Sequence, residues 1–404
     1  GRPGPVMVEI PADVATAEVP DNIVDGYSPI KPAAAAGNPA DVQAAAEALL
    51  NAENPVIHAG QGVMYGDATE ELIEFAELAQ IPVMTTMAGK SAFPEKHALA
   101  LGSGSGVMSR PVYHFVSRAD VVFGIGTSFT QHGMTMNVPS GKTLIHATND
   151  PIDIDKNYSI DHPIVGDAKL VLRQFIDACK DILGDRQRTD GSVAEEIASV
   201  RQEWLDEWMP TLTSNQKPIT PYRVIWEFMQ HIDSDEAIVT HDSGSPRDQI
   251  MPFYRAGGPR TYLGWGKSHG LGTGLGLNMG AKLADPNKFV VNFMGDAAFG
   301  MTGLDFETAA RSNIPILTVV FNNSTMAIET DAMELSHNLY GTRDLGGRYA
   351  DLGRDMGGWT ERVEDPEDVA AAILRAKDAT ENGQAALLEF VTNEERAFSH
   401  RRPF

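Results

Sequence analysis

Two oxygen-bearing residues, Asp296 and Asn323, stand at the ends of one predicted strand–helix–strand segment. Asp296 follows an apolar run that begins at Phe289, and Asn323 follows a second apolar run, 314–321. The crossover between parallel strands is right-handed and returns both strand ends to the same edge of a sheet, so we expect the two side chains to lie close together. A carboxylate and an amide carbonyl favour Mg²⁺ or Ca²⁺ bound to phosphate groups rather than a thiolate metal.

Two turns with small residues accompany this pair. Gly295 lets the backbone come close to a ligand, and the helix after it directs free N–H groups at an anion. The turn of Ser243, Gly244 and Ser245 follows a predicted strand, 237–240, and precedes a helix. Such a turn can donate hydrogen bonds to a diphosphate, although any tight turn uses the same residue types.

The interval from Gly295 to Asn323 resembles the signature of thiamine-diphosphate enzymes, in which Gly-Asp-Gly is followed after roughly thirty residues by Asn-Asn. Beyond the signature, almost the whole chain resembles the middle and cofactor-binding domains of the acetolactate synthase and pyruvate decarboxylase superfamily. The resemblance implies thiamine diphosphate with Mg²⁺, the metal being held by Asp296, Asn323 and the backbone carbonyl of Thr325. Ala297 replaces the second glycine of the signature, which requires a negative φ at this position.

The same resemblance implies a wider set of cofactor contacts. In the glycine-rich segment 264–283, relatives place a bulky Met, Ile or Leu beneath the cofactor, whereas matching the flanking glycines leaves Thr273 there, with Leu271 and Leu275 nearby. Close packing of a helix against a sheet is the alternative explanation for these glycines. The full set of implied cofactor-binding residues is Ser243, Gly244, Ser245, Leu271, Thr273, Gly295, Asp296, Ala297, Ala298, Asn323, Thr325, Ala327 and Ile328.

Glu329 and His269 are the candidate catalytic residues. Glu329 falls six positions after Asn323, where pyruvate decarboxylase-like proteins carry a glutamate that faces the reacting carbon. A carboxyl in a partly dry pocket can shuttle a proton, while a surface glutamate is the alternative. His269, Arg247 and Lys267 are candidates for contacting an anionic substrate.

Composition excludes several classes of function. A chain of 404 residues is long enough for two α/β domains, and no apolar run reaches membrane-spanning length, so we expect a cytoplasmic protein with no membrane partner. A formal charge of −23 argues against a nucleic-acid partner. The single cysteine, Cys179, lies on the apolar face of a predicted helix and is expected in the core.

Alternating strands and helices predict an α/β protein with two doubly wound parallel-sheet domains, the first of them Rossmann-like. We expect an inter-domain linker (1–40), a central domain (41–184), a linker helix (185–217) and a diphosphate-binding domain (218–404). In the central domain, the glycine turns 58–62 and 124–126 do not complete a dinucleotide fingerprint and read as tight turns. The resemblance leaves FAD, or a nucleotide or CoA, open there. The tail 394–404 is basic and is expected to be disordered, with closure over the cofactor as the alternative.

The resemblance implies a C–C bond lyase or carboligase that acts on a 2-oxo acid, in the manner of acetolactate synthases or decarboxylases. The glutamate that activates the cofactor is expected to come from a pyrimidine-binding part, which is either a separate N-terminal domain or a separate chain. The expected assembly is a homo- or hetero-oligomer, such as a dimer of dimers, with a small 2-oxo acid, aldehyde or acyl-CoA as substrate. The alternatives are a 2-hydroxyacyl-CoA lyase that uses the same cofactor and a non-catalytic module that kept the fold.

Overall fold

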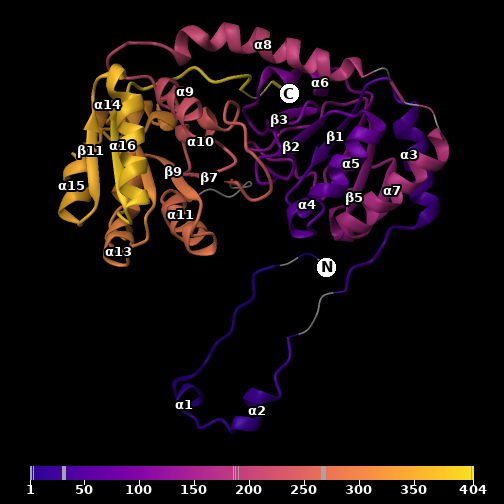
Figure 1. The fold of residues 1–404 in the computed structure, drawn as a ribbon, viewed down its shortest axis with the longest axis horizontal. Helices are drawn as coiled ribbons and strands as arrows, with labels where there is room; N and C mark the ends of the chain where they lie inside the picture. Colours follow the sequence, from indigo (N-terminus) through magenta and orange to yellow (C-terminus); the bar gives the residue numbers. More distant parts are fainter. Residues whose placement is uncertain are drawn as a thin grey trace.

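Two six-stranded parallel sheets form the body of the protein, and the long helix α8 (Ser192–Leu212) runs across both of them (Figure 1). The computed structural model describes residues 2, 4–29, 33–184, 186, 188–189, 191–264, 270–401 and 403–404. None of the helices in these described ranges has both the length and the apolar composition of a membrane span.

The first sheet has the strand order β3-β2-β1-β4-β5-β6, and all neighbouring strands are parallel. Its strands are β1 (Pro55–Ala59), β2 (Val83–Thr86), β3 (Ala100–Gly104), β4 (Val121–Ile125), β5 (Thr143–Thr148) and β6 (His162–Val165). The helices of this part are α3 (Pro39–Asn51), α4 (Gly62–Tyr65), α5 (Thr69–Ala79), α6 (Arg110–Arg118), η1 (Pro151–Asp153) and α7 (Ala168–Leu183). Strands β1 and β4 are buried along their whole length, which is typical of a parallel sheet covered by helices.

The second sheet has the order β11-β12-β10-β9-β7-β8, again with parallel neighbours. Its strands are β7 (Ala237–His241), β8 (Tyr262–Leu263), β9 (Phe289–Gly295), β10 (Leu317–Asn322), β11 (Trp359–Val363) and β12 (Ala386–Val391). Its helices are α9 (Pro221–His231), α10 (Ser245–Ile250), α11 (Thr273–Ala284), α12 (Asp296–Thr302), α13 (Asp305–Arg311), η2 (Ala327–Glu329), α14 (Glu334–Tyr340), α15 (Tyr349–Asp355), η3 (Pro366–Asp368) and α16 (Val369–Glu381). The predicted fold class is thus confirmed.

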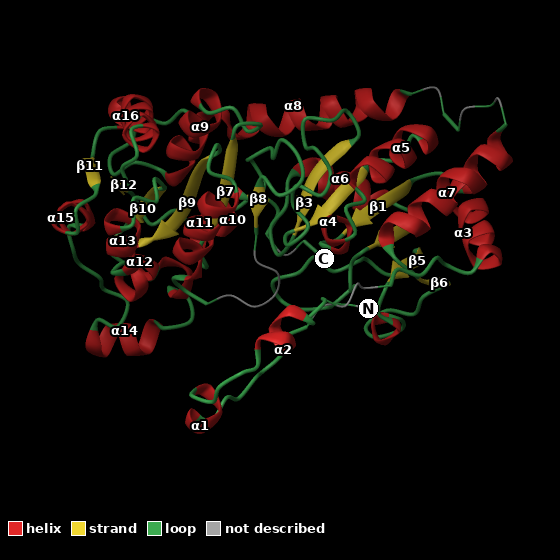
Figure 2. Cartoon of the chain, turned by 60° about the horizontal axis from the view of Figure 1, so that its bottom comes forward, coloured by secondary structure: helices red, strands yellow, loops and turns green. Residues whose placement is uncertain are grey.

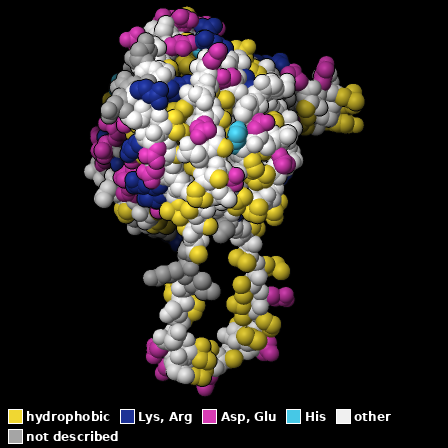
Figure 3. Space-filling view, turned by 90° about the vertical axis from the view of Figure 1, so that its right-hand side faces the viewer, with side chains coloured by type: hydrophobic (Ala, Val, Ile, Leu, Met, Phe, Trp, Pro, Cys, Tyr) yellow, Lys and Arg dark blue, Asp and Glu magenta, His cyan; other side chains and the backbone are white. Residues whose placement is uncertain are grey.

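The N-terminal segment leaves the body as an extended arm with two short helices, α1 (Ala12–Ala15) and α2 (Asp21–Asp25) (Figure 1). Its apolar side chains, among them Val6 and Met7, are exposed along the arm (Figure 3). Cys179 lies in the core as predicted, and burial raises the pKa of its thiol to about 12. Because the thiolate is the reactive form, this buried thiol is expected to be unreactive.

The basic tail is ordered along the seam between the two sheets, so the expectation of disorder is wrong for the described part of it. Ser399 is buried; its hydroxyl donates to the Met108 carbonyl at 2.7 Å and accepts from the Trp204 indole at 3.1 Å. Tyr113 stacks on His400 and Phe404. The tail therefore joins the central domain, α8 and the second sheet.

Candidate active site

Three polar turns meet at one edge of the second sheet because β7, β9 and β10 are neighbouring parallel strands (Figure 2). The turns after these strands carry Ser243–Ser245, Gly295–Ala297 and Asn323–Thr325. The first two turns are adjacent, since a Cβ placed on Gly295 would lie 4.0 Å from Cγ of Pro246. Carboxyl ends of parallel strands are the usual place for ligands in open α/β sheets.

Asp296 lies at this edge of the sheet, directly after β9. Its side chain is 2% exposed, and its two carboxylate oxygens accept hydrogen bonds from the Ala297 N–H at 2.8 Å and the Ser324 N–H at 2.7 Å. The second bond directly joins the turn after β9 to the turn after β10, as the crossover argument predicted. Burial raises the pKa of Asp296 to about 6, although backbone N–H groups oppose the shift. Ala297 lies in α12 and is not among the described residues with a positive φ. This agrees with the negative φ that an alanine requires at this position of the signature.

Asn323 and Thr325 add two further oxygens beside this carboxylate. The Asn323 side-chain oxygen accepts from the Thr325 N–H at 3.1 Å, and the Thr325 carbonyl accepts from the Ala327 N–H at 2.9 Å. Between them, Ser324 has φ of 57°, a left-handed conformation. Carbonyl-type oxygens keep a second lone pair after one hydrogen bond, so both remain able to bind a cation.

A hard divalent cation fits this donor set. Asp296 has no ion pair with a Lys, Arg or His in the part of the chain that the structure describes, so its buried negative charge is uncompensated. Carboxylate, amide and backbone oxygens are the ligands that Mg²⁺ and Ca²⁺ prefer. Among the described residues, no group of three or more His, Cys, Asp and Glu side chains could hold a metal, so only a mixed set such as this one is available.

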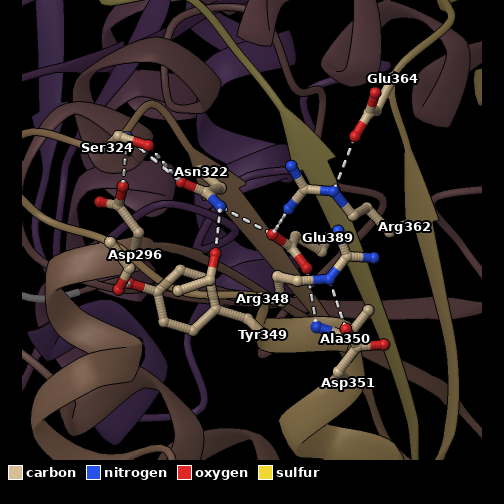
Figure 4. Close-up of polar contacts among 12 residues, drawn as sticks. Asp296, Asn322, Ser324, Arg348, Tyr349, Ala350, Asp351, Arg362, Glu364 and Glu389 are labelled. Carbon is tan, nitrogen blue, oxygen red and sulfur yellow. Dashed lines mark hydrogen bonds and ion pairs between the residues drawn. The ribbon is translucent and has the colours of Figure 1, made fainter.

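A buried polar network lies behind the turn after β10 (Figure 4). The Asn322 side-chain oxygen accepts from the Ser324 N–H and hydroxyl at 3.2 Å, and its amide donates to the Glu389 carboxylate at 2.7 Å. Glu389, fully buried in β12, also accepts from the Ala350 N–H at 2.8 Å and pairs with Arg362. The network anchors the turn to the sheet. Its two central residues, Asn322 and Glu389, were not predicted from the sequence, although the Asn doublet and a glutamate inside the apolar run 386–391 were visible signals.

The turn of Ser243, Gly244 and Ser245 is open on the side of its glycine. Gly244 has φ of 98°, and the nearest atom to a Cβ placed there is 3.9 Å away. Asp242, fully buried and also missed from the sequence, holds the turn: its carboxylate accepts from the N–H groups of Ser243 and Gly272 at 2.8 Å and of Gly274 at 2.9 Å. Burial raises the pKa of Asp242. This carboxylate fixes the start of α11 against the end of β7.

The implied wedge position is occupied by an exposed residue. Thr273 begins α11, and its hydroxyl donates to the Gly270 carbonyl at 2.7 Å, while Leu271 packs partly buried against the core of the second sheet. A Cβ at Gly272 would meet Thr302 at 2.1 Å, and one at Gly274 would meet Asn292 at 2.5 Å. Close packing therefore accounts for these two glycines.

A cavity of about 570 Å³ extends from the Ser243 turn. The predicted residues on its wall are Ser243, Gly244, Ser245, Ala327, Ile328 and Glu329, and the tail contributes Glu395, Arg396, Phe398 and Arg401. Glu329, in η2, is partly buried rather than on an open surface. The predicted metal-binding residues Asp296, Asn323 and Thr325 lie at the strand ends and are not on the described cavity wall.

Arg247, one of the candidates for contacting an anionic substrate, lines this cavity. Its side chain is 2% exposed, its Nε donates to Asp248 at 2.6 Å, and its buried Nη1 has no hydrogen-bond partner within the described residues. A buried guanidinium N–H without an acceptor is costly, which points to an acceptor from a ligand. The other candidates, His269 and Lys267, lie outside the described residues.

The glycine turns of the central domain pack against each other. A Cβ on Gly60 would lie 2.3 Å from the Gly126 carbonyl, and one on Gly62 would lie 2.7 Å from the Gly126 Cα. Backbone-to-backbone contact thus explains why glycine is needed, as the tight-turn interpretation predicted. It gives no support to FAD, a nucleotide or CoA in this domain.

Family models match both halves of the chain. Residues 42–175 match the thiamine pyrophosphate enzyme central domain, and residues 242–390 match the thiamine pyrophosphate enzyme C-terminal TPP binding domain. Together with the relatives described next, these matches show that the chain belongs to the thiamine pyrophosphate enzyme family, as its sequence motifs indicated.

Acetolactate synthases are among its curated relatives. The chain is 30% identical to a probable acetolactate synthase large subunit of Methanococcus aeolicus, over 99% of the chain and 69% of that protein. It is 31% identical to the corresponding protein of Methanocaldococcus jannaschii, over 97% of the chain and 67% of that protein. The chain therefore spans about two thirds of the length of these relatives.

A solved structure with the same fold is benzoylformate decarboxylase from Polynucleobacter necessarius. The TM-score is 0.72 at 21% identity, covering 92% of the chain and 67% of that structure. At this identity the likeness supports the fold alone.

Proposed function

We propose that this chain holds the metal and diphosphate of thiamine diphosphate in an enzyme that decarboxylates or ligates a 2-oxo acid. The observation that carries the proposal is the buried Asp296 carboxylate, which has no cation among the described residues and is bonded directly to the turn of Asn323 and Thr325. Acetolactate synthase relatives make the 2-oxo acid the favoured substrate class.

Each turn has one task in this proposal. Asp296, the Asn323 amide oxygen and the Thr325 carbonyl hold Mg²⁺, which compensates the buried carboxylate. Ser243 and Ser245 donate hydroxyl groups to the diphosphate, and Gly244 lets its backbone approach. Asp242 and Asn322 are positioning residues that keep the two turns in place.

The cavity beside these turns would hold the reacting part of the substrate. Thiamine diphosphate, when bound, supplies a nucleophilic carbon and an electron sink. Glu329 exchanges a proton with the substrate from the cavity wall, and Arg247 directs its unpartnered Nη1 to the substrate carboxylate. The neighbouring Asp248 keeps the guanidinium fixed, since Nε is bonded to it at 2.6 Å.

Full activity needs a pyrimidine-binding part that supplies the activating glutamate, and we propose that it acts from a separate domain or chain in an oligomer. The described relatives extend beyond the length matched here, which is consistent with such a part. A cytoplasmic location stays a prediction.

Calorimetry with inorganic diphosphate and Mg²⁺ tests the half-site by itself. The chain should bind diphosphate only when Mg²⁺ is present, Asp296→Asn should abolish this binding, and the exposed control Asp305→Asn should leave it unchanged. Equal binding by Asp296→Asn would refute the metal assignment. The chain assembled with its pyrimidine-binding part should then convert a 2-oxo acid; cleavage of a 2-hydroxyacyl thioester instead would favour the acyl-CoA lyase.

A further inference from the structure

A second cavity, of about 590 Å³, lies between the central domain, α8 and the second sheet. It shares no described lining residue with the cavity beside the Ser243 turn. Helix α8, which spans both sheets in Figure 1, forms one wall with Arg201 and Trp204, and α9 forms another with Trp226 and Met229. Such a volume lies in the range of small-molecule sites.

The walls of this cavity are mainly apolar and aromatic. Trp204 is buried and stacks on Phe253 with ring centroids 4.6 Å apart, while Trp226 and Met229 are only partly buried. Aromatic faces of this kind bind an apolar body of similar size. The cavity thus offers room for a ring or a branched aliphatic group.

Two arginines bring positive charge to the same cavity. Arg201 donates to the Ala100 carbonyl, and Arg255 donates to the Glu95 carbonyl from Nε at 2.9 Å and Nη2 at 2.7 Å. These acceptors are neutral, and neither arginine has an ion pair within the part of the chain that the structure describes. Burial, and then the charge of Arg255, lowers the pKa of Arg201 to about 10.

Glu95 and Asp233 also line this cavity, and the charge of Glu95 acts on both arginines, but the two carboxylates already have partners of their own. Glu95 bonds Lys90 at 2.5 Å and the Ala256 N–H at 2.8 Å, and Asp233 pairs with Lys96 at 2.8 Å. An anion is therefore the missing partner of the two guanidinium groups.

Two buried hydroxyl groups on the same cavity also lack partners. The Tyr254 and Ser234 hydroxyls have no hydrogen bond within the described residues, and their side chains are 2% and 8% exposed. Buried hydroxyl groups are normally bonded, so each can donate to a ligand oxygen.

We propose that this cavity is a binding site for a small apolar carboxylate, separate from the thiamine site. The ligand's carboxylate binds Arg201 and Arg255, and its aromatic or branched body lies between Trp204, Trp226 and Met229. Because the lining comes from both domains and from α8, a bound ligand ties these parts together and stabilises their arrangement.

The probes are 3-phenylpropanoate, its neutral analogue 3-phenylpropanol and its cationic analogue 3-phenylpropylamine, titrated calorimetrically into the chain. The carboxylate should bind at least about tenfold more tightly than the alcohol, and the amine should bind least. Arg201→Gln and Arg255→Gln should each weaken the carboxylate about tenfold without changing the alcohol. The control Arg375→Gln, which removes an exposed arginine paired with Glu361, should change neither.

Met229→Trp supplies a second test that removes no charge. Filling the cavity should abolish binding while the far-ultraviolet circular dichroism and unfolding midpoint stay at or above the wild-type values. Equal affinity for acid and alcohol, unchanged affinity in both arginine variants, or full binding by a folded Met229→Trp protein would each overturn the proposal. Competition between 3-phenylpropanoate and Mg²⁺–diphosphate would do the same, because it would place the ligand at the thiamine site.

Discussion

Replacing Asn322 with alanine tests the network that supports the metal-binding turn. The substitution removes the 2.7 Å bond from the Asn322 amide to the buried Glu389 carboxylate and two bonds of 3.2 Å from Ser324. A hydrogen bond to a charged group contributes about 1.5–3 kcal/mol, and a neutral bond about 1 kcal/mol. Because Arg362 still pairs with Glu389, we expect the free energy of unfolding to fall by about 2–4 kcal/mol rather than more.

Urea denaturation followed by tryptophan fluorescence measures this loss, since Trp359 lies in β11 beside the strand of Glu389. Asn382→Ala is the matched control, because Asn382 is exposed at the end of α16 and its side-chain amide donates to the Asp378 carbonyl rather than to a charged group. It should cost less than about 1 kcal/mol. A double-mutant cycle of Asn322→Ala with Glu389→Gln should give a coupling energy of about 1–3 kcal/mol.

The Asn322→Ala variant should also weaken the binding of Mg²⁺–diphosphate by about tenfold. Ser324 would lose its bond to the Asn322 side chain, and the Ser324 N–H would then no longer be held in place beside the Asp296 carboxylate. Equal stability of Asn322→Ala and Asn382→Ala would refute a supporting role of Asn322. A loss of stability with a coupling energy to Glu389 near zero would refute it as well, since the loss would then come from another contact.

Three further predictions address pH, metal and catalysis. Both ring nitrogens of His58 are buried without partners in the described chain, and burial, helped by the charge of His146, lowers its pKa from 6.5 to about 4. As pH falls, the unfolded chain therefore takes up this proton before the folded chain does. The free energy of unfolding should fall by about 3 kcal/mol as pH drops from 6.5 to 4. Urea denaturation of His58→Leu at the same pH values should not show this loss of stability. Asp296→Asn should stay folded yet lose stabilisation by Mg²⁺ and thiamine diphosphate in thermal melts; an unchanged Mg²⁺-dependent shift would contradict its role. Glu329→Gln should lower kcat of the assembled enzyme about 10²–10⁴-fold with unchanged cofactor affinity, whereas wild-type turnover would make Glu329 a wall residue only.

The local patterns that the sequence carries were enough for the fold class and for one edge of the site. Strands such as β1 and β10 are mainly apolar segments between segments of helical periodicity, and this alternation predicts parallel sheets without knowledge of distant contacts. The crossover rule similarly placed Asp296 beside the turn of Asn323. Strands β3, β6, β8, β11 and β12 were not predicted from the sequence; β8 has only two residues, and β11 is mostly half-exposed.

Side-chain roles that depend on distant partners were decided by the tertiary structure alone. Asn322 meets Glu389 across 67 positions of the chain, and Ser399 meets Met108 across 291. The sequence itself determines which residues can donate, accept or carry charge, and the periodicity that puts them on strands or turns. Packing alone decides whether Arg247 is buried with an unpartnered N–H, and whether Arg201 and Arg255 line one cavity without an ion pair among the described residues. Burial and charge compensation depend on neighbours that the fold brings together.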